Sequence, residues 1–220
     1  MNLILACGSE SVRRSGGPLT TDASMEIAPV LDASTVDSGE LRDDLANGCL
    51  EKVNQVDIET SLGLISIELD PVNAPKTVEN FLRYVDEGFY DGTDGKEATV
   101  FHRVLSGFMI QGGGLTESGS RKQTHSSIEL ESNNGLSNIR GAVAMARTPE
   151  PNSATSQFFI NHIDNLYLDY QSASDPGYAA FGKVVVGLDV VDAIARVTTN
   201  SNGLPNTPIL LVAVSRSKKD

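Results

Sequence analysis

From residue 53 onward the sequence is a series of short apolar runs of strand length, separated by turn-forming residues. The runs "VNQVDIET" and "GLISIELD" alternate apolar and polar side chains, and the residues at 61–63 between them suit a hairpin. Further runs are "GAVAMAR", "SQFFI", "AAFGKVVVG" and "PILLVAV", and the stretch at 99–111 has strand chemistry broken by Gly107. Strands do not alternate with helices, so the pattern predicts a mainly β protein with a closed or sandwiched antiparallel sheet.

Only two stretches have the period of a helix. In "APKTVENFLRYVDEG" an apolar stripe runs from Val78 to Val85, Pro75 suits a first helical turn and Gly88 suits the end. The apolar spacing of "LDVVDAIARV" predicts the second helix. We therefore expect a barrel capped by two α-helices.

The charge and the cysteine and histidine positions exclude several classes of function. Aspartate and glutamate number 29 against 17 lysine and arginine, a formal net charge of -12, which repels nucleic acids and anionic lipid surfaces. Cys7 and Cys49 both precede the strand-rich region, so no disulfide framework is expected there. His102, His125 and His162 stand far apart in the sequence, so we expect no metal site.

The first 52 residues differ from the rest of the chain. Ser, Gly, Asp, Thr and Ala predominate without a sustained period, which predicts a disordered acidic tether ahead of a domain at 53–217. The opening "MNLILACGSE" resembles the end of a secretory signal at a bacterial lipoprotein cleavage site, with Cys7 as the lipidated residue. This places the protein in the bacterial cell envelope, in the periplasm or as an outer-membrane lipoprotein, and limits membrane contact to the lipid anchor. The alternative is an incidental cysteine in a cytoplasmic protein.

The stretch "FHRVLSGFMIQGGG", residues 101–114, sets Arg103 and Gln111 among large apolar side chains. Arginine keeps its charge at any working pH, so a half-buried Arg103 needs hydrogen-bond acceptors. The neighbouring sequence offers no carboxylate, which indicates that a ligand supplies the acceptor. The three glycines are not a phosphate-binding loop, because the Lys-Ser/Thr pair of that motif is missing.

Three long motifs occur in order: "FHRVLSGFMIQGG", "MARTPEPNSATSQFFIN" and "FGKVVVGLDVVDAI". Together they resemble the cyclophilin-type peptidyl-prolyl cis-trans isomerases, particularly the bacterial ones, over residues 53–216. The resemblance implies an eight-stranded antiparallel β-barrel capped by two α-helices. It also implies an enzyme that acts on proline-containing, unfolded or partly folded polypeptides without a cofactor or a metal. We expect this enzyme to be a monomer.

The resemblance implies catalytic roles for Arg103 and Gln111. Resonance gives the prolyl C–N bond double-bond character and a barrier of ~18–20 kcal/mol, and rotation localises the lone pair on the nitrogen. A donor aimed at that nitrogen stabilises the twisted transition state more than either ground state, which suits Arg103. Neutral Gln111 can orient the substrate carbonyl without adding a second full charge.

The same resemblance implies the substrate-binding residues. The apolar pocket for the proline ring is formed by Phe108, Met109, Phe159 and Leu168. The peptide backbone contacts Ala146 and Arg147, and Gln157 lies beside the pocket entrance. Tyr167 and Tyr178 occupy positions at which animal members carry tryptophan and histidine, so we expect weak cyclosporin binding.

Other interpretations of these residues remain open. The groove would also serve a binding module or chaperone for proline-containing segments with incidental turnover, and the acidic face would suit a surface adhesin. Arg103 favours catalysis, because binding a ground-state proline needs no donor at the nitrogen. His102 is expected to be a hydrogen-bonded structural residue, since adjacent strand residues face opposite ways. The polar insertions at 94–98 and 170–177 are expected to be surface loops that shape substrate access.

Overall fold

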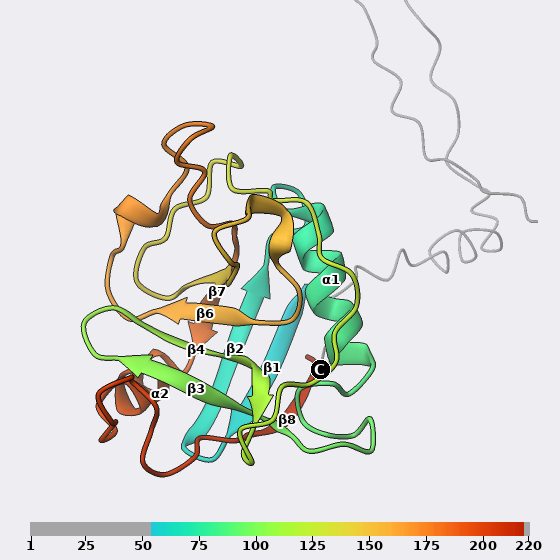
Figure 1. Ribbon diagram of the computed structural model, residues 1–220, viewed down its shortest axis with the longest axis vertical. Helices are drawn as coiled ribbons and strands as arrows, with labels where there is room; N and C mark the ends of the chain where they lie inside the picture. The colour runs from blue at the N-terminus through green and yellow to red at the C-terminus, as the bar shows by residue number, and fades with distance from the viewer. Residues whose placement is uncertain (1–53, 218–220) are drawn as a thin grey trace, which may run out of the picture. The chain divides into compact units, whose positions relative to one another are not determined.

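The computed structural model describes residues 54–217, so Cys7 and the expected tether lie outside the described residues. The strands are β1 (Gln55–Thr60), β2 (Gly63–Leu69), β3 (Thr99–Leu105), β4 (Met109–Thr116), β5 (Ala142–Met145), β6 (Phe158–Asn161), β7 (Ala180–Val186) and β8 (Leu211–Arg216). The helices are α1 (Pro75–Asp86) and α2 (Leu188–Ala195), with short 3-10 turns at Pro151–Ser153 and Leu166–Leu168 (Figure 1).

The eight strands form one sheet in the order β3-β4-β6-β5-β7-β2-β1-β8. Every neighbouring pair is antiparallel. The two end strands approach one another through a bridge between Val100 and Leu210 and a 2.9 Å bond from Phe101 N to Ile209 O. The sheet is thus a nearly closed barrel, with α1 and α2 at different ends of it (Figure 1), which confirms the predicted fold class.

The sequence explains where the first elements begin and end. The two residues after Thr60 form the hairpin turn, and Thr60 pairs with Gly63 as expected. Helix α1 begins at Pro75 without a side-chain cap of its own. Instead, Glu131 accepts bonds from the backbone N–H groups of Lys76 and Thr77, at 3.1 and 2.8 Å. A distant carboxylate therefore satisfies the free donors at the positive end of this helix.

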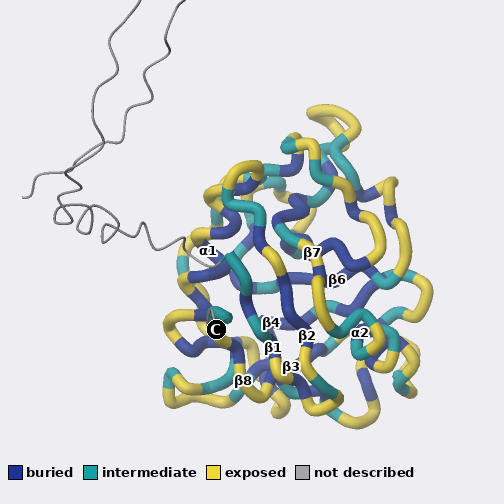
Figure 2. Tube along the Cα trace, turned by 180° about the vertical axis from the view of Figure 1, so that it is seen from behind, coloured by how far each residue is buried: buried dark blue, intermediate teal, exposed yellow. Residues whose placement is uncertain are grey.

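Aromatic side chains fill the barrel interior. The fully buried ones are Phe81, Tyr84, Tyr90, Phe101, Phe158 and Phe181. Phe81 of α1 contacts Phe158 edge-on, with ring centroids 5.4 Å apart, and lies 5.2 Å from Phe181. Strands β4, β5 and β6 are buried along most of their length, whereas β7 and β8 also carry exposed residues (Figure 2). The helix with the predicted apolar stripe therefore supplies part of the core.

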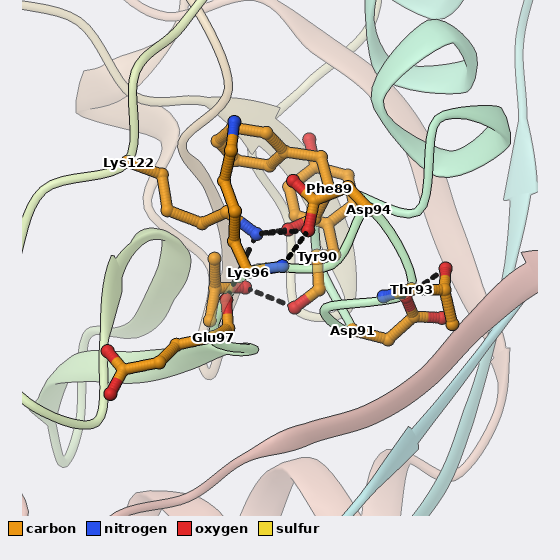
Figure 3. A network of polar contacts seen from close by, with 9 residues as sticks. Phe89, Tyr90, Asp91, Thr93, Asp94, Lys96, Glu97 and Lys122 are labelled. Atoms are coloured by element: carbon orange, nitrogen blue, oxygen red, sulfur yellow. Dashed lines mark hydrogen bonds and ion pairs between the residues drawn. The ribbon is translucent and has the colours of Figure 1, made fainter.

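The insertion at 94–98 lies on the surface but is fastened to the barrel by one buried lysine. The Lys122 ammonium donates to Phe89 O at 2.6 Å, Asp94 Oδ1 at 3.1 Å and Glu97 O at 3.0 Å (Figure 3). It also lies 4.7 Å from the centroid of the Phe89 ring. The side chains of Lys122 and Asp94 are only 3% and 15% exposed, so this pair is shielded from water and a partner left alone there is costly.

We predict that Lys122→Met lowers the free energy of unfolding by about 3 kcal/mol, because Asp94 and two carbonyl groups lose a buried partner. Urea denaturation monitored by circular dichroism measures the change. Lys96→Met is the matched control, since the Lys96 side chain of the same loop is exposed. Equal midpoints for both variants would show that the Lys122 pair adds nothing to stability.

Candidate functional site

A second group of buried apolar side chains lies apart from the barrel interior, and we name it the pocket cluster. Its members are Met109, Ala144, Phe159, Leu168 and Ala180, with Leu105, Phe108, Leu136, Ala146 and Tyr178 partly buried against them. Of the residues expected to bind substrate, Phe108, Met109, Ala146, Phe159, Leu168 and Tyr178 belong to this cluster. Residues from five separate parts of the sequence therefore meet at one place.

The alternation of strand residues explains why this cluster exists. Along β6, Phe158 and Ile160 face the barrel core while Phe159 between them joins the pocket cluster. Strands β4 and β5 flank β6, and Phe159 pairs with Gln111 on one side and with Ala144 on the other. Phe159 and Ala144 are therefore buried apolar residues on the outer face of strands whose other face fills the barrel, and Gln111 lies beside them as a polar group.

A bulge in β3 turns Arg103 toward solvent. Phe101 pairs with Gly112 and Arg103 with Gln111, so His102 is an extra residue in the ladder. Without it, Arg103 would share the inward face of Phe101. The extra residue shifts the alternation of inward and outward side chains by one position, so that Val104 is buried and Arg103 is exposed. Our expectation of a half-buried Arg103 was therefore wrong, while Gln111 is half-buried as expected.

Arg103, Gln111 and Gln157 form a short polar row beside the pocket cluster. Arg103 Nη1 lies 3.5 Å from Gln111 Oε1, a long contact, whereas Gln111 Nε2 donates to Gln157 Oε1 at 2.9 Å. A Cβ atom on Gly114 would lie 2.4 Å from Gln157 Cγ, so the last glycine of the "QGGG" run makes room for this side chain. Within residues 54–217 the long contact is the only hydrogen bond of the Arg103 guanidinium. Its remaining N–H groups are available to a ligand.

The His102 ring lies on the same side of the strand as this polar row, next to Gln157, and not on the opposite side. Burial lowers the pKa of the His102 imidazole below its ordinary value, and contacts with the Val100 backbone and the Gln157 amide act in the other direction. Its Nδ1 atom is buried and has no hydrogen-bond partner among the described residues. The expected orientation was wrong because the bulge interrupts the strand alternation, and the expected hydrogen bond is absent at Nδ1.

Aromatic and cationic contacts form the walls of the pocket cluster. The rings of Phe108 and Tyr167 are stacked at 6.2 Å, and Phe159 and Tyr178 meet edge-on at 5.7 Å. The Arg147 guanidinium lies 4.7 Å from the Tyr178 ring centroid, and its Nε donates to the Gly177 carbonyl at 2.9 Å. Arg147 therefore joins the end of β5 to the inserted loop at 170–177, whose tip is exposed as expected.

Three buried asparagines behind the pocket cluster were missed from the sequence. Asn165 donates to Phe108 O at 2.9 Å and to Asn161 Oδ1 at 2.8 Å. Asn161 donates to Asn138 Oδ1 at 3.2 Å, and Asn138 donates to Tyr178 O at 3.3 Å. This asparagine chain links the backbones of two pocket residues. The only signal in the sequence is the run of polar residues in "NHIDN", directly after an apolar strand.

Other features of the described residues do not compete with this site. A hollow of about 530 Å³ lies beside α1, and one of about 620 Å³ lies beside β2 and β7. Neither is lined by Arg103 or Gln111, although the second shares Leu136 and Ala180 with the pocket cluster. Over residues 54–217 no group of three or more His, Cys, Asp or Glu side chains is arranged to hold a metal ion.

The sequence family described as cyclophilin type peptidyl-prolyl cis-trans isomerase/CLD matches residues 55–216. The chain is 49% identical over 169 residues to the peptidyl-prolyl cis-trans isomerase cyp18 of Streptomyces antibioticus, covering 76% of this chain and 98% of the relative. It is 46% identical over 166 residues to the peptidyl-prolyl cis-trans isomerase A of Dickeya dadantii, covering 74% and 84%.

A solved structure supports the same relationship. The crystal structure of a cyclophilin type peptidyl-prolyl cis-trans isomerase of Cryptosporidium parvum matches with a TM-score of 0.63 at 25% identity, covering 76% of this chain and 99% of that one. With the barrel, the ordered motifs and these relatives in agreement, the chain belongs to the cyclophilin-type peptidyl-prolyl cis-trans isomerases and is an enzyme of that class.

Proposed function

We propose that this enzyme accelerates rotation about Xaa-Pro bonds by donation from Arg103 to the prolyl nitrogen, with the proline ring held against the pocket cluster. The observation that carries the proposal is the free guanidinium of Arg103 beside an apolar surface. A buried ion pair would compete with the substrate for this charge. Arg103 forms no ion pair with any residue in 54–217, so its donors stay available for the twisted amide.

Gln111 is suited to hold the substrate carbonyl. An amide nitrogen carries two N–H donors, and Gln157 accepts one of them at 2.9 Å. The other donor remains for a peptide carbonyl, while the bond to Gln157 limits the rotation of the side chain. We infer that Gln157 acts through Gln111 and that Gln111 acts directly on the substrate.

The pocket cluster suits a proline ring and its flanking backbone. Met109 and Phe159 are 2% and 4% exposed and form an apolar floor, while Phe108 and Tyr178 are half-buried and form walls. Ala146 and Arg147 directly follow β5 and are partly exposed, which supports the proposal that they contact the peptide backbone. One chain supplies all of these residues, so we propose that the enzyme acts as a monomer on proline-containing polypeptides.

We predict that Arg103→Ala lowers the isomerisation rate about 100- to 1,000-fold, the loss typical of one donor to a developing charge. NMR exchange between the cis and trans signals of a short Xaa-Pro peptide measures the rate. The fold should survive, because the Arg103 side chain is exposed and makes only one long contact. The melting temperature of the variant checks this.

Arg83→Ala is the matched control, since this exposed arginine lies on α1 and pairs with Glu87. It should leave the exchange rate unchanged, and the wild-type rate should persist in a chelator. An Arg103→Ala variant as fast as wild type would refute the catalytic role. A wild-type protein that binds the peptide without accelerating exchange would instead support the binding-module alternative.

A second prediction concerns Tyr167, which is 65% exposed and stacks on Phe108. We expect Tyr167→Trp to tighten cyclosporin binding, because an indole has a larger face and an N–H donor that the phenol lacks. Isothermal titration with cyclosporin measures the change. Leu166→Trp, at the exposed neighbouring position, controls for the added tryptophan, and equal affinities in the two variants would contradict the assignment of Tyr167.

We also propose a location in the bacterial cell envelope, with Cys7 as a lipid anchor and folding proteins as clients. The support is the resemblance of "MNLILACGSE" to a lipoprotein cleavage site. In the part of the chain that the structure describes, no helix is long and apolar enough to cross a bilayer.

Cys7→Ser should move the protein from the membrane fraction to the soluble fraction of a bacterium that expresses the gene with its upstream region. Immunoblots of the fractions report the shift. Cys49→Ser is the control for loss of a cysteine and should fractionate like wild type. If wild type and Cys7→Ser are both soluble, the lipoprotein proposal is wrong.

A further inference from the structure

The turn between β3 and β4 carries Phe108 to the pocket cluster, and a histidine holds this turn. Phe108 N donates to Leu105 O at 3.0 Å, which closes the turn, and Gly107 has a φ of +74° that suits glycine. The backbone N–H of Gly107 takes no part in the hydrogen bond that closes the turn. It donates to His162 Nδ1 at 3.0 Å.

The other ring nitrogen of His162 faces helix α2. Its Nε2 lies 3.3 Å from Asp192 Oδ1. Since Gly107 N–H needs an acceptor, we assign the proton of the neutral ring to Nε2, which then donates to the carboxylate. Arg140 donates to both oxygens of Asp192, at 2.8 and 3.1 Å. On the far side of the carboxylate, Arg196 Nη2 lies 3.7 Å from Asp192 Oδ2.

The carboxylate that faces His162 stays ionised. The bond from Arg140 holds the pKa of Asp192 below its ordinary value, with smaller contributions from His162 and Arg196. Arg140 Nη1 also donates to the His162 carbonyl at 3.0 Å. The ring is therefore fixed from the side of α2, and its Nδ1 lone pair points at the turn.

The segment after β6 contacts the Phe108 turn at several points. The His162 backbone N–H and the Asn165 amide both donate to Phe108 O at 2.9 Å. The Tyr167 ring stacks on the Phe108 ring. His162 Nδ1 instead accepts from Gly107, the residue before Phe108. The bonds to Gly107 N–H and to Phe108 O together hold the peptide units on both sides of Phe108.

We propose that His162 is a positioning residue for substrate binding, which rests on the proposed function of the pocket cluster. Its Nδ1 atom holds Gly107 so that the Phe108 side chain keeps its place as a wall of the proline pocket. It touches no substrate itself. Because Phe108 contacts the proline ring in the ground state and in the transition state, loss of this contact should raise KM more than it lowers kcat.

A purely structural role for His162 would depend on Nε2 and Asp192 rather than on Nδ1. Two substitutions separate these contacts. His162→Asn places an amide oxygen near the position of Nδ1 and cannot reach Asp192, whereas His162→Gln extends toward Asp192 and lacks the acceptor beside Gly107. His162→Ala removes both contacts, and Ile163→Ala is the control at the exposed neighbouring residue.

The experiment measures kcat and KM of the full chain for an Xaa-Pro peptide, together with hydrogen exchange of the Gly107 amide by NMR. We expect His162→Ala and His162→Gln to raise KM about two- to tenfold, the equivalent of one net hydrogen bond, with kcat within about twofold of wild type. Their Gly107 amide should exchange faster. His162→Asn should stay closer to wild type in both measurements.

Each outcome decides the matter. Equal KM values for the Asn and Gln variants, or a larger loss in His162→Asn, would overturn the positioning role while leaving the proposed catalysis by Arg103 intact. A lower kcat with unchanged KM would overturn it as well. If wild type does not accelerate isomerisation at all, the proposed function fails and the positioning role fails with it.

Discussion

The site depends on strands that are buried on both faces. In a barrel of this size one face of each strand fills the interior, and the other face normally meets solvent. In β4, β5, β6 and β7 one outward residue each, Met109, Ala144, Phe159 and Ala180, is apolar and buried, and these four form most of the buried part of the pocket cluster. The fold and the site therefore share the same backbone, since any shift of register in these strands would exchange a core residue for a pocket residue.

Buried polar groups fix the backbone positions that apolar packing alone does not determine. Apolar contacts are not directional, so they bring Phe108 and Tyr178 to one place without fixing their backbones. The hydrogen bonds of the asparagine chain are directional and fix these backbones. Asn138, Asn161 and Asn165 are at most 1% exposed, and each has hydrogen-bond partners. A buried amide without partners is costly, which makes the arrangement of these side chains specific.

Much of the fold could be predicted from the period of the apolar residues. The split of the 99–111 stretch at Gly107 and the start of α1 at Pro75 both follow from local chemistry. The bulge at His102 could not, because one extra residue in a ladder depends on the partner strand and hardly changes the local pattern. This is why the exposure of Arg103 and the orientation of His102 were wrongly predicted.

The site was predictable only in part, because its details also depend on contacts between residues far apart in the sequence. The residues expected to bind substrate came from the motifs, and six of them lie together in the pocket cluster. The contacts that hold them join residues far apart in the sequence, such as Asn165 and Phe108, or Lys122 and Phe89. Glu131 at the start of α1 is another case. None of these pairs leaves a periodic signal, so each required the three-dimensional structure.

The strand order has a consequence for how the protein is synthesised. Strand β8 pairs with β1 along its length and approaches β3 on the other side, so the last strand of this domain to be synthesised is the one that closes the sheet. Until then β1 and β3 present unpaired edges, which invite pairing with other chains. The domain therefore cannot complete its sheet until residues 211–216 have been synthesised, and the incomplete domain is prone to aggregation until then.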